Sequence, residues 1–118
     1  MKSEQDAKNT KGAARNEELA AIAELDRTVH SPARLMILAF LNAAESADFV
    51  FLMRETGLTR GNLSSHMSAL ENEGYIEVVK EFVDRRPLTL LKITKTGREA
   101  FQSYAEQMRG ILETFAGE

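Results

Sequence analysis

The chain has 118 residues, of which 43% are hydrophobic, enough for one domain with a buried core and too few for two. It contains no cysteine, which excludes disulfide bonds, thiolate zinc sites and cysteine nucleophiles. The formal net charge of −3 argues against a protein that coats nucleic acid, although residues 58–98 carry seven Lys/Arg against five acids. We expect a cytoplasmic protein, because the N-terminus lacks the apolar segment of a signal peptide and no apolar run could cross a bilayer.

The N-terminal part reads as a charged tail followed by a first helix. Residues 1–16 have interleaved charges and no periodic apolar positions, so we interpret them as a disordered or frayed tail. Residues 17–118 are interpreted as the folded domain. From Glu17 to Val29 the apolar spacing predicts an amphipathic helix. Its stripe consists of Leu19, Ile22, Ala23, Asp26 and Val29.

A second helix begins at the dipeptide Ser31-Pro32. Serine is a favoured N-cap, and proline is tolerated at the first helical position, where its missing N–H has no helical partner. The helix that follows, to about Ala44, is apolar nearly all round, which predicts the central helix of the core. His30 lies beside this start and is interpreted as a structural or surface residue.

The stretch from Asp48 to Gly74 predicts two helices joined by a tight turn. Asp48 and Thr59 are N-cap candidates, and Gly57 supplies the positive φ that commonly ends a helix. In the second helix, the recurring apolar residues Leu63, Met67 and Leu70 predict a buried face. The opposite face is small and polar, with Gly61, Ser65, Ser68 and Asn72 at its centre and Asn62, Ser64 and Ala69 at its sides.

This small polar face indicates a close partner. An ordinary surface helix carries Lys and Glu, which favour helix and solubility, whereas Ser, Asn and Gly weaken a helix. Short hydrogen-bonding side chains let a helix backbone approach its partner closely, as it must in the major groove of DNA. The alternative is a polar face that is serine-rich without a binding role.

A β-hairpin is predicted next. Tyr75–Phe82 and Leu88–Ile93 are rich in β-branched and large apolar residues and read as its two strands, with Ile76 and Val78 facing inward. Val83–Pro87 is the expected turn, with Asp84-Arg85-Arg86 at the tip and Pro87 preventing a continued central ladder. The alternative for this tip is a solvated turn with an internal ion pair.

The last predicted helix is capped by Thr94. Its apolar residues step by three and four, a coiled-coil-like seam of Phe101, Tyr104, Met108, Ile111 and Phe115. So small a monomer can hardly bury this seam together with the stripe of Leu19 and Ile22. We therefore expect the terminal helices to pair with a second copy in a twofold homodimer. The alternative is a last helix that folds back on its own domain.

The order of these elements carries a family resemblance. LTRGNLSSHMSALENEGYIEV resembles the recognition helix and first wing strand of MarR and ArsR transcriptional regulators, and FVDRRPLTLLKITKTGREAF resembles their wing and closing helix. The resemblance spans roughly residues 31–101. It implies an α+β, mostly α, winged helix-turn-helix fold with a two-stranded wing and terminal dimerisation helices. It also implies a dimeric transcription factor, usually a repressor, on a pseudo-palindromic operator in double-stranded DNA, with a possible small-molecule effector for which no residue can be named.

The resemblance assigns the DNA contacts. A helix at about residues 59–73 is expected in the major groove, and a wing at residues 83–87 on the flanking backbone or in the minor groove. The positions that match the family are Thr59, Arg60, Asn62, Ser64, Ser65 and Ser68 in the helix and Asp84, Arg85 and Arg86 in the wing. Lys80 is expected from its charge alone to add attraction to phosphate. Asp84 is expected to orient an arginine, and His66 to bond backbone or phosphate. No metal or other cofactor is expected, because the two histidines lie far apart and cysteines are absent.

The sequence leaves two alternatives to a DNA-binding function. The first is a winged-helix module that uses the same face to bind protein, which the negative net charge favours and the lack of aromatic anchors on that face disfavours. The second is an enzyme, which the lack of a Gly-rich phosphate loop disfavours. The run Ser64-Ser65-His66 makes no catalytic triad, because neighbouring residues of a helix point in different directions.

Overall fold

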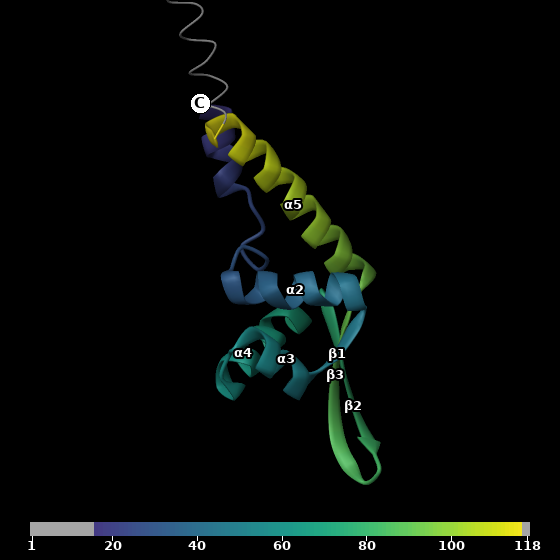
Figure 1. Ribbon diagram of the computed structural model, residues 1–118. Helices are drawn as coiled ribbons and strands as arrows, with labels where there is room; N and C mark the ends of the chain where they lie inside the picture. Colours follow the sequence, from purple (N-terminus) through teal and green to yellow (C-terminus); the bar gives the residue numbers. More distant parts are fainter. Residues whose placement is uncertain (1–15, 117–118) are drawn as a thin grey trace, which may run out of the picture. The chain divides into compact units, whose positions relative to one another are not determined.

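The computed structural model describes residues 16–116, so the predicted tail lies almost wholly outside the described residues. A helical segment at residues 16–23 precedes the labelled elements in Figure 1. These are α2 (Pro32–Ala44), β1 (Ser46–Asp48), α3 (Phe49–Thr56), α4 (Arg60–Asn72), β2 (Ile76–Val83), β3 (Arg86–Ile93) and α5 (Lys95–Ala116). The mostly helical α+β prediction is confirmed. The described residues divide into two compact units. One consists of residues 26–102, and the other combines the described residues before 26 with those after 102.

Helices α2, α3, α4 and α5 begin at the four predicted N-cap residues. In each case a side-chain oxygen accepts a hydrogen bond from the backbone amide three residues further on, which satisfies one of the unpaired amides of the first turn. The four bonds are Arg34 N–H to Ser31 (3.4 Å), Phe51 N–H to Asp48 (3.1 Å), Asn62 N–H to Thr59 (3.1 Å) and Gly97 N–H to Thr94 (3.0 Å). Gly57 ends α3 with φ 72°, as predicted.

The core of the unit at residues 26–102 is built around α2, as predicted. The fully buried side chains come from α2, α3, α4, β3 and the segment before α2: Val29, Ile37, Leu38, Leu41, Leu52, Leu63, Leu70 and Leu91. Met36 is 43% exposed, so α2 has one free edge and is not buried all round. Figure 1 shows α2 lying across α3 and α4, with the β2–β3 hairpin extending beyond them.

The sheet has three strands in the order β1-β3-β2, one more than the sequence predicts. The additional strand, β1, pairs antiparallel with residues 90–92 of β3. Its three residues, Ser-Ala-Asp, have no β propensity of their own. The strand forms because β3 offers a free edge there, which sequence periodicity cannot reveal.

The hairpin turn is tighter than predicted. Val83 pairs with Arg86, so the turn consists of Asp84 and Arg85 alone, with φ of 51° and 67°. Two positive φ values are typical of a type I′ turn, whose twist matches that of the strands. The expected interruption at Pro87 is wrong. Pro87 comes directly after Arg86, whose pair with Val83 closes the turn, so the Pro87 nitrogen points away from β2. It points to the other edge of β3, where β1 does not extend, so proline costs the sheet no hydrogen bond there.

The first helix is shorter than predicted, because Asp26 forms a turn. Helical structure ends at residue 23 rather than at Val29. Asp26 Oδ1 accepts hydrogen bonds from the backbone amides of Thr28 (2.9 Å) and Val29 (3.2 Å). Such local bonds from an aspartate side chain replace the hydrogen bonds that the backbone would form in a helix. Val29 is consequently part of the core and not of a helical stripe.

In the unit formed by the chain ends, the predicted seam is partly buried within the chain. Tyr104 and Ile111 are 6% and 4% exposed, and Leu25 is 4% exposed. Leu112, which the seam did not include, is 56% exposed, and Leu19 is 53% exposed. Pairing of the terminal helices with a second copy remains a prediction. Of the helices in the described part, none has the length and apolar character needed to cross a membrane.

Candidate nucleic-acid interface

Helix α4 presents the predicted small polar face to solvent. Its buried side is made by Leu63 and Leu70, which are fully buried, while Met67 is half-buried. The exposed residues at its start and along the opposite side are Thr59, Arg60, Gly61, Asn62, Ser65, Ser68 and Asn72, with Ser64 half-buried. The burial pattern therefore matches the two faces derived from the sequence.

The start of α4 holds a positioned arginine. The Arg60 guanidinium lies over the ring of Phe49, the first residue of α3, at 5.6 Å from the ring centroid. Phe49 is 6% exposed, so the ring is a fixed platform, and the cation–π contact limits the freedom of an otherwise exposed side chain. Sequence analysis singled out Arg60 but missed Phe49, which lies eleven residues earlier and reads only as a core position.

The middle of α4 is fixed to α2 through His66. Arg34 Nε donates to His66 Nδ1 (3.1 Å), and Arg34 Nη1 donates to the Thr28 carbonyl (3.3 Å). The expected phosphate contact of His66 stays a prediction, because Arg34 occupies only the Nδ1 atom of the ring. The contact places His66 among the groups that hold α4 in place.

Tyr75, three residues beyond the end of α4, is hydrogen-bonded to the turn at Asp26. Its hydroxyl donates a hydrogen bond to Asp26 Oδ2. That bond, followed by burial and the negative charges of Asp26 and Glu73, raises the pKa of Tyr75 to about 12. The backbone carbonyl of Tyr75 lies so close to Gly97 that an added Cβ would be 2.0 Å from it, which explains the glycine in the first turn of α5.

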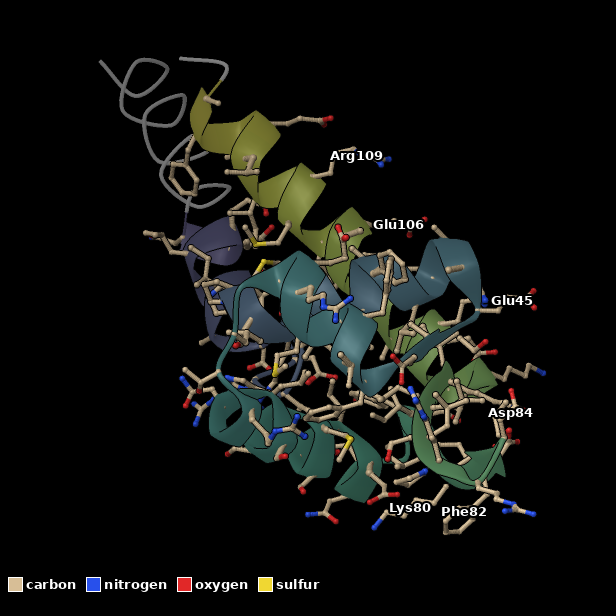
Figure 2. The ribbon with its side chains drawn as sticks, turned by 60° about the horizontal axis from the view of Figure 1, so that its bottom comes forward. Glu45, Lys80, Phe82, Asp84, Glu106 and Arg109 are labelled. Carbon is tan, nitrogen blue, oxygen red and sulfur yellow. The ribbon has the colours of Figure 1, made fainter. Side chains whose placement is uncertain are left out.

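The β2–β3 hairpin has two chemically different faces. Strand register places Lys80 opposite Thr89 and Phe82 opposite Pro87, and these pairs share the face that carries buried Ile76 and Leu91. Glu77 and Glu81 lie on the other face. Figure 2 shows Lys80 and Phe82 pointing outward at the same edge of the view.

The basic residues of the hairpin are all at the surface. Lys80, Arg85 and Arg86 are exposed, as is Asp84. Among the contacts of the described residues, none is an ion pair between Asp84 and either arginine, so the internal pairing considered for this tip is not formed.

The sequence pattern of the winged helix DNA-binding domain matches residues 33–112. The chain belongs to this winged helix DNA-binding domain family. Accordingly, α4 takes the position of the recognition helix in the winged-helix fold, and the β2–β3 hairpin takes the position of the wing. The matched range covers both elements and most of α5.

Similar proteins agree with this assignment. An uncharacterized protein of Methanocaldococcus jannaschii is 40% identical over 75 residues, which cover 64% of this chain and 82% of that protein. The structure of a transcriptional regulator homologue from Pyrococcus horikoshii is 32% identical, with a TM-score of 0.76, covering 82% of this chain and 95% of that one. A MarR-family regulator from Silicibacter pomeroyi, 20% identical with a TM-score of 0.58, shares the fold over 91% of this chain and 70% of that one.

These comparisons confirm the predicted resemblance to MarR-like winged-helix regulators. They indicate a DNA-binding transcriptional regulator rather than an enzyme. Sequence analysis missed one exposed wing residue, Phe82, although strict alternation along β2 from buried Ile76 would have placed it on the face of Lys80.

Proposed function

We propose that the protein is a sequence-specific, dimeric repressor that binds a pseudo-palindromic operator in double-stranded DNA. The recognition helix α4 enters the major groove, and the wing contacts the flanking backbone or the minor groove. The observation that carries this proposal is the exposed face of Gly61, Ser65 and Ser68, which is free of long side chains along the helix. Such a face lets the α4 backbone approach base edges closely.

The roles along α4 follow from reach and chemistry. Arg60 has the length to bond a guanine edge with two donors, a contact worth about 1–3 kcal/mol of base discrimination, and its stacking on Phe49 reduces the entropy lost on binding. Asn62 suits an adenine edge. Thr59, Ser64, Ser65 and Ser68 contact phosphates or bases, in part through water.

The wing supports the proposal through Arg85, whose backbone conformation is unfavourable for arginine. Arg85 has φ 67°, a left-handed conformation that costs a residue with a side chain about 1–2 kcal/mol and glycine almost nothing. An arginine kept at this position indicates a role outside folding. With Arg86 and Lys80 it provides three cations for phosphate or for a narrow minor groove.

The homodimer rests on the apolar surface of the terminal helices. Leu19 and Ile22 on the first helical segment are exposed, and so is Leu112 on α5. A groove of about 570 Å³ lies along α5, lined by Ala105, Met108, Arg109, Leu112, Glu113 and Ala116. A second copy would cover these side chains, together with the seam residues Phe101, Tyr104, Met108, Ile111 and Phe115 where they remain accessible. A twofold dimer then presents two recognition helices to two half-sites.

Selection of genomic DNA fragments by the purified full chain tests this function. We expect enrichment of a duplex with inverted half-sites about one helical turn apart. Arg60→Ala should weaken binding to that duplex more than to random duplex, because base readout is lost in addition to charge. Arg86→Ala should reduce affinity and its salt dependence on both. Failure to enrich any duplex at low salt would overturn the proposal and favour a protein-binding module.

The dimer is tested separately by sedimentation. Leu112→Glu places a charge on the apolar surface of α5 and should shift the protein from dimer to monomer. Arg109→Glu, on the rim of the same groove, leaves its apolar residues in place and should have a smaller effect. A wild-type protein that sediments as a monomer at all concentrations would contradict the dimer.

A further inference from the structure

The wing carries an apolar side chain that the fold does not use. Phe82 is 79% exposed, more than any other large hydrophobic side chain among the described residues. A phenylalanine left in water forgoes the stabilisation that burial would bring, so an aromatic residue here contributes little to folding. Its cross-strand partner Pro87 is also exposed and covers little of the ring.

The position of Phe82 is fixed by the register of the hairpin. The pair Val83–Arg86 closes the two-residue turn, and Phe82–Pro87 is the next pair. The ring therefore stands one pair behind the tip, on a ladder whose closing turn has two defined positive φ values. It sits on a rigid two-stranded support and not on a loose loop.

The charge around Phe82 is suited to nucleic acid. On its own face of the wing the neighbours toward the core are Lys80 and Thr89, and the acids Glu77 and Glu81 lie on the opposite face. Beyond it, the tip consists of Asp84 and Arg85, both exposed. A phosphate backbone approaching this face meets Lys80 on one side of the ring, the arginine and the aspartate of the turn on the other, and no carboxylate from β2.

A protein partner fits this surface less well. Hot spots at protein interfaces are clusters of large side chains from which water is excluded. On the Phe82 face of the outer wing the other pair consists of Lys80 and Thr89, so the ring stands without a second large apolar group. A single apolar ring between cations matches the DNA minor groove, where apolar side chains enter between base pairs while basic residues hold the phosphates.

We infer that Phe82 is a wedge that enters the minor groove flanking each half-site and partly unstacks one base step. This inference rests on the proposed function. It adds a residue whose binding energy depends on how easily the DNA sequence deforms. A flexible pyrimidine–purine step costs less to unstack than other steps, so the wedge selects sequence at a position without a hydrogen-bonding contact.

The experiment uses the duplex that the wild-type protein selects from genomic DNA, with 2-aminopurine placed at successive positions flanking a half-site. Binding of the wild-type protein should raise 2-aminopurine fluorescence at one step on each flank. Phe82→Ala should abolish this rise and weaken binding by about fivefold to a hundredfold. Val50→Ala, at an exposed apolar residue of α3 outside the wing, is the control and should behave as wild type.

The outcomes separate the inference from the function on which it rests. Phe82→Ala with wild-type affinity and wild-type fluorescence would overturn the wedge and leave DNA binding intact. Weaker binding by Phe82→Ala without any fluorescence change in the wild-type complex would also overturn insertion, since the ring would then lie on the groove wall. If the wild-type protein selected no duplex, the proposed function would fail and the wedge with it. Equal thermal midpoints of the three proteins would show that folding is unchanged.

Discussion

Arg34 Nε donates a hydrogen bond of 3.1 Å to His66 Nδ1 and so joins α2 to the middle of the recognition helix. The same guanidinium bonds the Thr28 carbonyl in the turn that follows the first helical segment. Tyr75, just beyond the end of α4, bonds Asp26 in that same turn. Helix α4 and the residue three positions beyond its end are thus both connected to residues 26–28, which fixes the face that we propose α4 presents to DNA.

Removing the acceptor on α4 should loosen this arrangement. His66→Ala should lower the free energy of unfolding by about 1.5–3 kcal/mol, the range for a hydrogen bond that involves a charged group, even though alanine is the better helix former. His66→Asn keeps an acceptor near the position of Nδ1 and should lose less. Urea denaturation of the three proteins measures this, and an alanine variant as stable as the wild type would contradict it.

The bond between Tyr75 and Asp26 should be visible in an alkaline titration. The folded protein holds the Tyr75 proton up to a pKa of about 12, above the ordinary value of 10.0. The contribution of Tyr75 to the free energy of unfolding is therefore fully present below pH 10, the pKa of tyrosine in the unfolded chain. It is lost as the pH rises from 10 toward 12, because the unfolded chain releases this proton first.

Tyrosinate absorbance measures the ionisation of the two tyrosines of the chain. Burial also raises the pKa of Tyr104, so both should ionise late in the wild type. Asp26→Asn removes the charge and should return only the Tyr75 pKa toward its ordinary value. A titration curve unchanged by this substitution would show that Asp26 does not hold the Tyr75 proton.

Gly97 should not accept a side chain. A Cβ there would lie 2.0 Å from the Tyr75 carbonyl oxygen, and the opposing atoms are backbone, so the chain must shift. We expect Gly97→Ala to cost about 1–3 kcal/mol of stability. Gly110→Ala in the same helix meets nothing within 4 Å among the described residues and should add up to about 1 kcal/mol. Thermal unfolding distinguishes the two, and equal effects would contradict the close approach.

The wing tip should show a conflict between stability and binding. Arg85→Gly relieves a left-handed arginine and should raise the free energy of unfolding by about 1 kcal/mol. It should also weaken DNA binding. The slope of log affinity against log salt concentration should fall by the amount expected for about one lost phosphate contact. Arg86→Gly, one residue later in β3, removes the same charge but should destabilise the strand. A loss of stability in Arg85→Gly would argue against the strained tip.

The local features of the fold were predictable because they depend on neighbouring residues. Ser31, Asp48, Thr59 and Thr94 cap their helices through bonds that span three residues, and Gly57 supplies its positive φ alone. The exposed face of α4 followed from the periodicity of Leu63 and Leu70 in the same way.

The features that sequence reasoning missed depend on contacts between distant residues. Strand β1 exists through pairing with β3, and Asp26 leaves the first helix because it binds both local amides and Tyr75, 49 residues later. The partners of Arg60 and His66 likewise come from other helices, α3 and α2. Periodicity within one segment contains no information on such pairs, so the site residues were found but the groups that position them were not.

The central claim is that the small polar face of α4 lies against a DNA duplex. Placing a carboxylate on this face tests the claim most directly. Ser68→Glu and Ser103→Glu make the same change at exposed helix positions, the first on the α4 face and the second on α5. Titration of the selected duplex by fluorescence anisotropy should give at least about tenfold weaker binding for Ser68→Glu, because the new charge meets the phosphates, and unchanged binding for Ser103→Glu. Equal affinity of Ser68→Glu, Ser103→Glu and the wild type would contradict the account.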